Sequence, residues 1–147
     1  MKCEITGEKI LNKFRVERTP KIDLTPSVII DFDGTIYAGE FDEKSIIGDP
    51  VITNLGCSSI VYIRKLHKEG IPIKIFSCRN TQIDGVKLMK AWLRGNGLEE
   101  EIIHSIEFPT HKPYGIYIDD NCALALKYGV YFPTIDEIKE WLKQKGK

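Results

Sequence analysis

Short, mainly apolar runs alternate along the chain with longer segments in which apolar residues recur at helical spacing. The runs lie at residues 28–32, 71–76, 102–108, 115–118 and 130–132. Strands buried on both faces of a parallel sheet are continuously apolar, and crossover helices join one such strand to the next. The pattern therefore predicts an α/β domain with a mainly parallel sheet of about five strands.

Segments with helical spacing follow three of these runs. Their apolar positions are Ile60, Ile63 and Leu66 in the first, Ile83, Val86, Met89 and Leu93 in the second, and Ile135, Ile138, Trp141 and Leu142 in the third. Thr134 and Glu137 have the spacing of a capping box, which marks the start of the third helix. We expect the first two helices to be crossovers and the third to close the domain.

Length and charge limit what this domain can be. The chain has 147 residues, enough for one full domain, which we assign to residues 27–147. Residues 1–26 lack a comparable pattern and form an N-terminal extension of unknown role. Lysine plus arginine (21) equals aspartate plus glutamate (21), so the formal net charge is zero. We therefore expect no strong field for nucleic acid or for an anionic membrane surface.

The sequence also indicates a compartment. Its apolar runs are far shorter than the roughly 20 residues of a membrane-crossing helix, and its first residues lack the apolar core of a secretory signal. The four cysteines stand singly, without C-x-x-C spacing, which favours reduced thiols. We expect a cytoplasmic protein.

Polar side chains follow three of the predicted strands. The first ends in Asp31 and Asp33, Ser77 follows the second, and Asp119 and Asp120 follow the fourth. Parallel strands bind ligands at their carboxyl ends, and carboxylates gathered there repel one another unless a cation separates them. Oxygen ligands suit Mg²⁺. Taken singly, each aspartate is a common turn former and the serine a common helix cap, so it is their joint occurrence that predicts a magnesium site.

These motifs together resemble the four motifs of the haloacid dehalogenase superfamily, in residue type and in order. They are the D-x-D-G-T run at 31–35, Ser77 after an apolar run, a downstream lysine, and the aspartates at 119–120. The resemblance covers about residues 28–132, and the spacing leaves no room for an inserted cap domain. It implies a three-layer, Rossmann-like fold similar to the small capless phosphatases of the superfamily.

The resemblance implies a Mg²⁺-dependent phosphatase that hydrolyses a phosphomonoester through an aspartyl-phosphate intermediate. Asp31 would attack phosphorus, and Asp33 would first protonate the leaving oxygen and then activate water. The Asp31 carboxylate, the Asp33 backbone carbonyl and Asp119 would hold the metal. Asp120 would adjust that metal shell through water or hydrogen bonds. Ser77 would donate a hydrogen bond to a phosphoryl oxygen.

The positive charge that binds phosphate has two candidates. Lys112 matches the motif order but lies only seven residues before Asp119, so it reaches the site only from a loop at the carboxyl end of the third strand. Arg79, two residues after Ser77, has a planar fork that suits phosphate. A solvated loop lysine and an arginine beside a helix cap are the alternatives without function.

An uncapped site favours a phosphorylated macromolecule end, or a partner chain that closes the cleft in a homo-oligomer. A phosphorylated small molecule is the other substrate class, and the acidic residues at 40–43 argue against a polyanionic nucleic acid. The alternative functions are a phosphotransferase of the same fold, a non-catalytic domain and a phosphoacceptor signalling domain. Signalling domains carry their acidic pair first and the phosphoacceptor later, whereas here the D-x-D-G-T run opens the domain.

Overall fold

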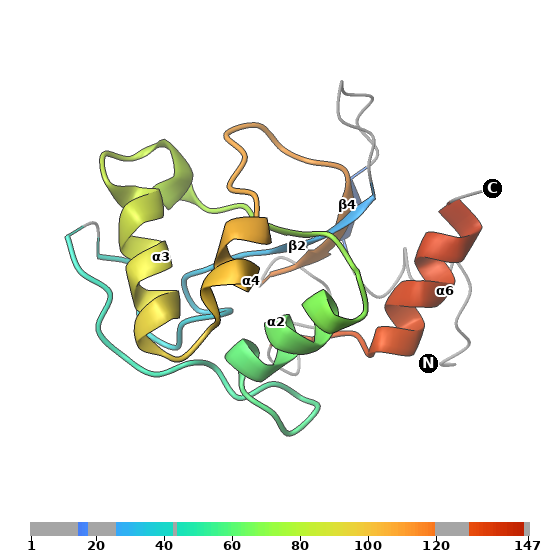
Figure 1. The fold of residues 1–147 in the computed structure, drawn as a ribbon. Helices are drawn as coiled ribbons and strands as arrows, with labels where there is room; N and C mark the ends of the chain where they lie inside the picture. Colours follow the sequence, from blue (N-terminus) through green and yellow to red (C-terminus); the bar gives the residue numbers. More distant parts are fainter. Residues whose placement is uncertain (1–14, 18–25, 43, 120–129, 146–147) are drawn as a thin grey trace.

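The computed structural model describes residues 15–17, 26–42, 44–119 and 130–145, drawn in colour in Figure 1. These residues form a mixed α/β structure with one sheet. The elements are β1 (Arg15–Glu17), β2 (Ser27–Ile30), α2 (Ser59–Lys68), β3 (Ile73–Ile75), the 3₁₀ helix η1 (Cys78–Thr81), α3 (Gly85–Gly95), α4 (Glu100–Ser105), β4 (Gly115–Ile118) and α6 (Ile135–Lys145). The predicted α/β class is confirmed.

The sheet has the strand order β1-β4-β2-β3. β2 pairs in parallel with both β4 and β3, whereas β1 pairs antiparallel with β4. Ile30 lies opposite Ile75 on one side and Ile118 on the other, so the three parallel strands end level with one another. The residues that follow these strands therefore meet at one edge of the sheet.

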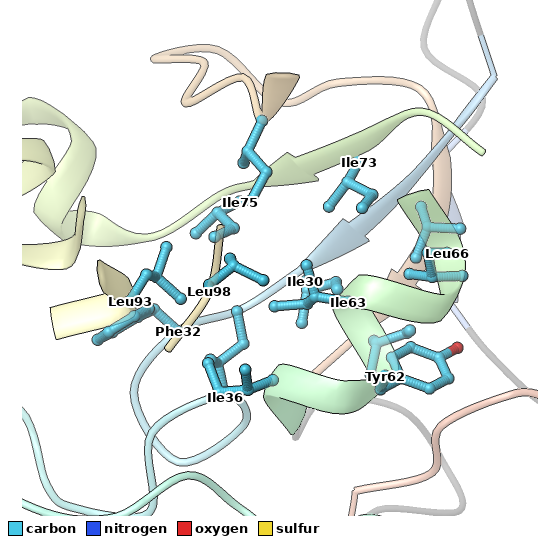
Figure 2. Packing of buried hydrophobic residues seen from close by; sticks show 14 of the residues in the cluster. Ile30, Phe32, Ile36, Tyr62, Ile63, Leu66, Ile73, Ile75, Leu93 and Leu98 are labelled. Carbon is cyan, nitrogen blue, oxygen red and sulfur yellow. The ribbon is translucent and has the colours of Figure 1, made fainter. Parts of the chain in front are cut away.

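The hydrophobic core joins the sheet to the helices. Val28 and Ile30 of β2 alternate along the strand and belong to the same cluster as Ile63 of α2 and Leu93 of α3. Figure 2 shows Ile30, Ile63 and Leu93 packed together. All four side chains are buried, with no exposed surface. Burying them contributes roughly 1.5–3 kcal/mol each, which anchors the parallel strands whose ends carry the predicted site.

Local signals set the helix ends. Ser58 caps α2, because its hydroxyl accepts a hydrogen bond from the backbone N–H of Val61, and Gly70 follows the helix with a φ of 73°. The predicted capping box of α6 is confirmed. The N–H of Glu137 donates to the Thr134 hydroxyl at 3.1 Å, and the N–H of Thr134 donates to the Glu137 carboxylate at 3.0 Å.

The predicted strand at 102–108 is wrong, because residues 100–105 form the helix α4. Ile102, Ile103 and Ile106 are all buried, and this spacing fits one face of a helix. Only Glu107 extends the sheet, through an isolated parallel bridge to Lys74. The apolar run therefore combines a short helix with a single sheet-like residue.

The predicted strand at 130–132 is also wrong, since these residues have no strand partner in the part of the chain that the structure describes. The Asn54 side chain replaces one: it accepts from the N–H of Phe132 at 2.7 Å and donates to the carbonyl of Phe132 at 3.1 Å. Phe132 is nevertheless buried. Its apolar neighbourhood reflects core packing, while its backbone groups are satisfied by a side chain.

The segment that we treated as an N-terminal extension contributes β1 to the edge of the sheet.

No helix in the described part of the chain combines the length and the apolar character that crossing a membrane requires.

Candidate active site

A cavity of about 440 Å³ lies at the carboxyl edge of the parallel strands. Asp31 follows β2, Ser77 lies two residues beyond β3, Asp119 follows β4, and all three line this cavity together with Lys112. The other lining residues are Phe76, Cys78, Asn80, Thr81, Pro109, Thr110 and Tyr117. The structure therefore brings four of the predicted site residues, from distant parts of the sequence, to one cavity.

A tight turn places Asp31. Its backbone N–H continues the sheet by donating to the carbonyl of Ile118, and its carboxylate accepts from the N–H of Phe32 at 2.8 Å. The carbonyl of Phe32 then accepts hydrogen bonds from residues 35, 36 and 37. Gly34 adopts a φ of 78°, which favours glycine, so the D-x-D-G-T run supplies the turn as well as the carboxylates.

Ser77 and Asn80 connect the end of β3 to the loop that precedes Lys112. Ser77 is buried and caps η1, since its hydroxyl accepts from the N–H of Arg79 at 3.2 Å. The Asn80 amide donates to the carbonyls of Ile75 and Pro109, both at 2.7 Å. Asn80 is a positioning residue that the sequence reasoning missed, because nothing in its spacing distinguishes it from a solvated loop asparagine.

Lys112 satisfies the geometric condition set by the sequence, because it lines the cavity from a loop at the carboxyl edge. The chain returns abruptly after it. The Tyr117 hydroxyl donates to the carbonyl of Pro113 at 2.7 Å, which holds this loop against β4. The loop follows α4 and the bridge at Glu107 rather than the strand expected there.

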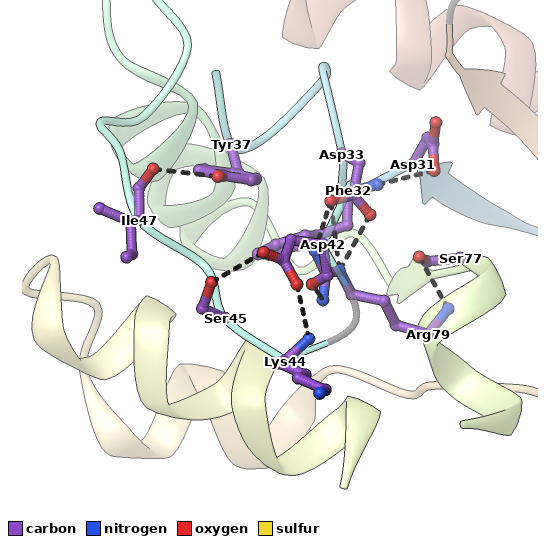
Figure 3. Close-up of polar contacts among 10 residues, drawn as sticks. All are labelled: Asp31, Phe32, Asp33, Tyr37, Asp42, Lys44, Ser45, Ile47, Ser77 and Arg79. Carbon is purple, nitrogen blue, oxygen red and sulfur yellow. Dashed lines mark hydrogen bonds and ion pairs between the residues drawn. The ribbon is translucent and has the colours of Figure 1, made fainter. Parts of the chain in front are cut away.

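Asp33 and Arg79 do not line this cavity but contact each other (Figure 3). The Arg79 Nε donates to both Asp33 carboxylate oxygens, at 3.2 and 3.0 Å, and Nη2 donates to Oδ1 at 2.7 Å. The Arg79 side chain has no exposed surface, and that of Asp33 is 15% exposed. The two residues form a buried ion pair beside the site.

The remaining contacts of Arg79 are also with the protein. Its Nη1 donates to the backbone carbonyl of Asp42 at 2.9 Å, and its guanidinium lies 4.7 Å from the centre of the Phe41 ring. Each guanidinium nitrogen therefore donates to a protein oxygen. Among the described residues, the cation that lines the cavity is therefore Lys112 and not Arg79.

The residues that fit a metal ion are Asp31 and Asp119, whose side chains line the same cavity. Mg²⁺ is commonly held by one or two carboxylates, with waters and substrate phosphate completing its shell, so this donor set fits. Among the residues described, no three side chains of His, Cys, Asp or Glu form a metal-binding group. The predicted ligand Asp120 lies outside the described residues.

No family model, curated protein or solved structure matches the chain.

Proposed function

We propose that this protein is a Mg²⁺-dependent phosphatase of the haloacid dehalogenase type, which hydrolyses a phosphomonoester through an aspartyl-phosphate on Asp31. The observation that carries the proposal is the shared cavity. Its lining combines a carboxylate nucleophile (Asp31), a second carboxylate (Asp119), a hydroxyl (Ser77) and a cation (Lys112). A phosphoryl group needs these partners: a nucleophile, hydrogen-bond donors and positive charge.

The reaction would proceed in two steps. In the first, an Asp31 oxygen attacks phosphorus, the bond from phosphorus to the ester oxygen breaks, and Asp33 gives its proton to that oxygen. In the second, water attacks the aspartyl-phosphate, its proton passes to Asp33, and the Asp31 carboxylate is regenerated. Dividing the hydrolysis in this way replaces one difficult step by two easier ones.

The other cavity residues bind and orient the phosphoryl group. The Ser77 hydroxyl donates a hydrogen bond to a phosphoryl oxygen, and the Lys112 ammonium contributes a charge-assisted one. Asp31 and Asp119, with the backbone carbonyl of Asp33, would hold the metal. When bound, Mg²⁺ neutralises negative charge on the phosphoryl group.

The proposal extends to a three-layer, Rossmann-like architecture and to a cytoplasmic location. A second covered face is supported by Ile29, Lys74 and Tyr117, which lie on the opposite face of the strands from the core cluster and are only 1%, 4% and 2% exposed. The described cysteines Cys57 and Cys78 are free thiols, which fits a reducing compartment.

The test is hydrolysis of p-nitrophenyl phosphate with Mg²⁺. We expect turnover by the wild type, its loss in Asp31→Asn, and its loss when the metal is chelated, with recovery on adding Mg²⁺. Asp136→Asn is the matched control, because it makes the same chemical change at an exposed residue in the first turn of α6. Full activity of Asp31→Asn would contradict the proposal. A single phosphorylation without turnover would instead favour the phosphoacceptor alternative.

A further inference from the structure

The ion pair between Asp33 and Arg79 joins the two loops that carry the proposed nucleophile and phosphate ligand. Asp33 lies two residues after Asp31, and Arg79 lies two residues after Ser77. Three hydrogen bonds, of 2.7 to 3.2 Å, hold the Asp33 carboxylate against the guanidinium (Figure 3). The pair therefore fixes the position of one loop relative to the other beside the cavity.

Arg79 is itself held on several sides. Its backbone N–H donates to the Ser77 hydroxyl, its Nη1 donates to the carbonyl of Asp42, and the Phe41 ring lies over its guanidinium. A buried guanidinium with fixed partners presents a fixed fork of donors. The carboxylate that it binds therefore has one preferred orientation, which a carboxylate in a solvated turn does not have.

We propose that Arg79 is a positioning residue for the second half of the reaction, the hydrolysis of the aspartyl-phosphate; this rests on the proposed function. In that step the water oxygen attacks phosphorus, and the bond between phosphorus and the Asp31 oxygen breaks. Its electron pair returns to the Asp31 carboxylate, and the water proton passes to Asp33. A carboxylate in an ion pair accepts hydrogen bonds, as the proton acceptor of this step must.

The first half of the reaction makes the opposite demand, since Asp33 must then donate a proton to the leaving oxygen. A substrate whose leaving group departs without a proton removes that demand. With 2,4-dinitrophenyl phosphate, only the second step depends on Asp33. Loss of Arg79 then slows the release of phosphate from the enzyme but leaves the release of dinitrophenolate intact.

The experiment compares the wild type with Arg79→Lys, which keeps the positive charge but loses the planar guanidinium and its fixed set of hydrogen-bond donors. Rapid mixing with 2,4-dinitrophenyl phosphate and Mg²⁺ follows the burst of dinitrophenolate and the later steady state. For Arg79→Lys we expect a burst approaching one equivalent per enzyme. We expect its steady-state rate to be lower by about 10²-fold, a typical size for the loss of a well-placed base. Acid quenching of the same reaction should recover the accumulated phosphoenzyme.

Phe41→Ala is a second variant, chosen because Phe41 is 44% exposed and its loss does not open the core. It removes the ring that lies over the guanidinium. We expect Phe41→Ala to slow the release of phosphate less than Arg79→Lys does, so that its burst of dinitrophenolate is smaller than that of Arg79→Lys. Asp33→Asn should show a burst of dinitrophenolate at least as large as that of Arg79→Lys, because it removes the proton acceptor itself. Asp31→Asn should show neither a burst nor turnover, because it lacks the group that becomes phosphorylated.

If the wild type is active and Asp31→Asn is inactive, the proposed function stands, and either of two outcomes would then overturn the role of Arg79. One is unchanged kinetics in both Arg79→Lys and Phe41→Ala. The other is a parallel fall of burst and steady state that follows the folded fraction measured by circular dichroism, as a merely structural role predicts. A wild type that hydrolyses no phosphate ester contradicts the proposed function itself, and this inference falls with it.

Discussion

Replacing Asp33 by alanine should destabilise the protein markedly, even though Asp33 lies at a loop near the surface. The reason is its partner. The Arg79 side chain has no exposed surface, so water cannot replace the three hydrogen bonds that it loses. Removing one partner of a buried ion pair costs about 3–5 kcal/mol. Arg79 keeps its bond to the Asp42 carbonyl, which places our expectation at the lower end, about 3 kcal/mol.

Urea unfolding measures this loss. Trp92 and Trp141 are both buried and report unfolding by fluorescence. With a denaturant slope of about 2 kcal/mol/M, a loss of about 3 kcal/mol lowers the unfolding midpoint by roughly 1.5 M. Asp33→Asn should lose less stability than Asp33→Ala, because the amide retains one oxygen that accepts hydrogen bonds from Arg79.

A matched control is Glu99→Ala. Glu99 also forms a two-oxygen pair with an arginine, Arg64, but these side chains are 44% and 41% exposed. Exposed pairs contribute little to stability, so the midpoint of Glu99→Ala should shift far less than that of Asp33→Ala. Equal shifts in the two variants would refute the argument, because burial of the guanidinium would then not determine the cost.

Three further predictions concern other parts of the molecule. Burial raises the pKa of Tyr62 well above its ordinary value of about 10, so the folded state keeps this proton at a pH where the unfolded state loses it. The contribution of Tyr62 to the free energy of unfolding should therefore be fully present below pH about 10 and be lost above it. In alkaline denaturation the free energy of unfolding should fall less steeply with pH for Tyr62→Phe than for the wild type, and equal slopes would contradict this. Gly85→Ala should lower the melting temperature, because its new Cβ collides with the Arg79 carbonyl, whereas Gly95→Ala meets no atom within 4 Å and should be neutral or stabilising; the reverse order in calorimetry would be inconsistent with this packing. Lys112→Met should lower kcat/KM for p-nitrophenyl phosphate by about 10²-fold with little change in melting temperature, and an unchanged kcat/KM would remove Lys112 from the site.

The parallel strands and their polar ends could be predicted because both depend on local sequence. β2 and β4 each end in three apolar residues, and each is followed at once by an aspartate. Since parallel strands end at the same edge, the meeting of Asp31, Ser77 and Asp119 at one cavity follows from topology. The helix starting after Thr134 was equally predictable, because a capping box is a local signal.

The errors arose where short apolar runs fit two structures. Isoleucines at 102, 103 and 106 suit a strand by composition and a helix by spacing, and the acidic pair at 100–101 in the first turn of α4 was the signal that favoured the helix. At 130–132 the deciding contact comes from Asn54, which lies 78 positions away from Phe132. A local pattern cannot anticipate such a partner.

The contact between Asp33 and Arg79 has the same origin. These residues are 46 positions apart, and only the packing of η1 against the turn after β2 brings them together. The sequence identified Arg79 as a candidate phosphate ligand because its fork suits carboxylates and phosphates alike. Which of the two it binds is decided by the fold, and here the partner is a carboxylate.

The most direct test of the central claim is to locate the phosphorylated residue. Borohydride reduction of the enzyme during turnover converts an aspartyl-phosphate to homoserine, and peptide mass spectrometry identifies the altered position. The account predicts homoserine at residue 31 in the wild type, dependent on both Mg²⁺ and substrate. Homoserine at another aspartate, or an unaltered Asp31 during measurable turnover, would contradict it.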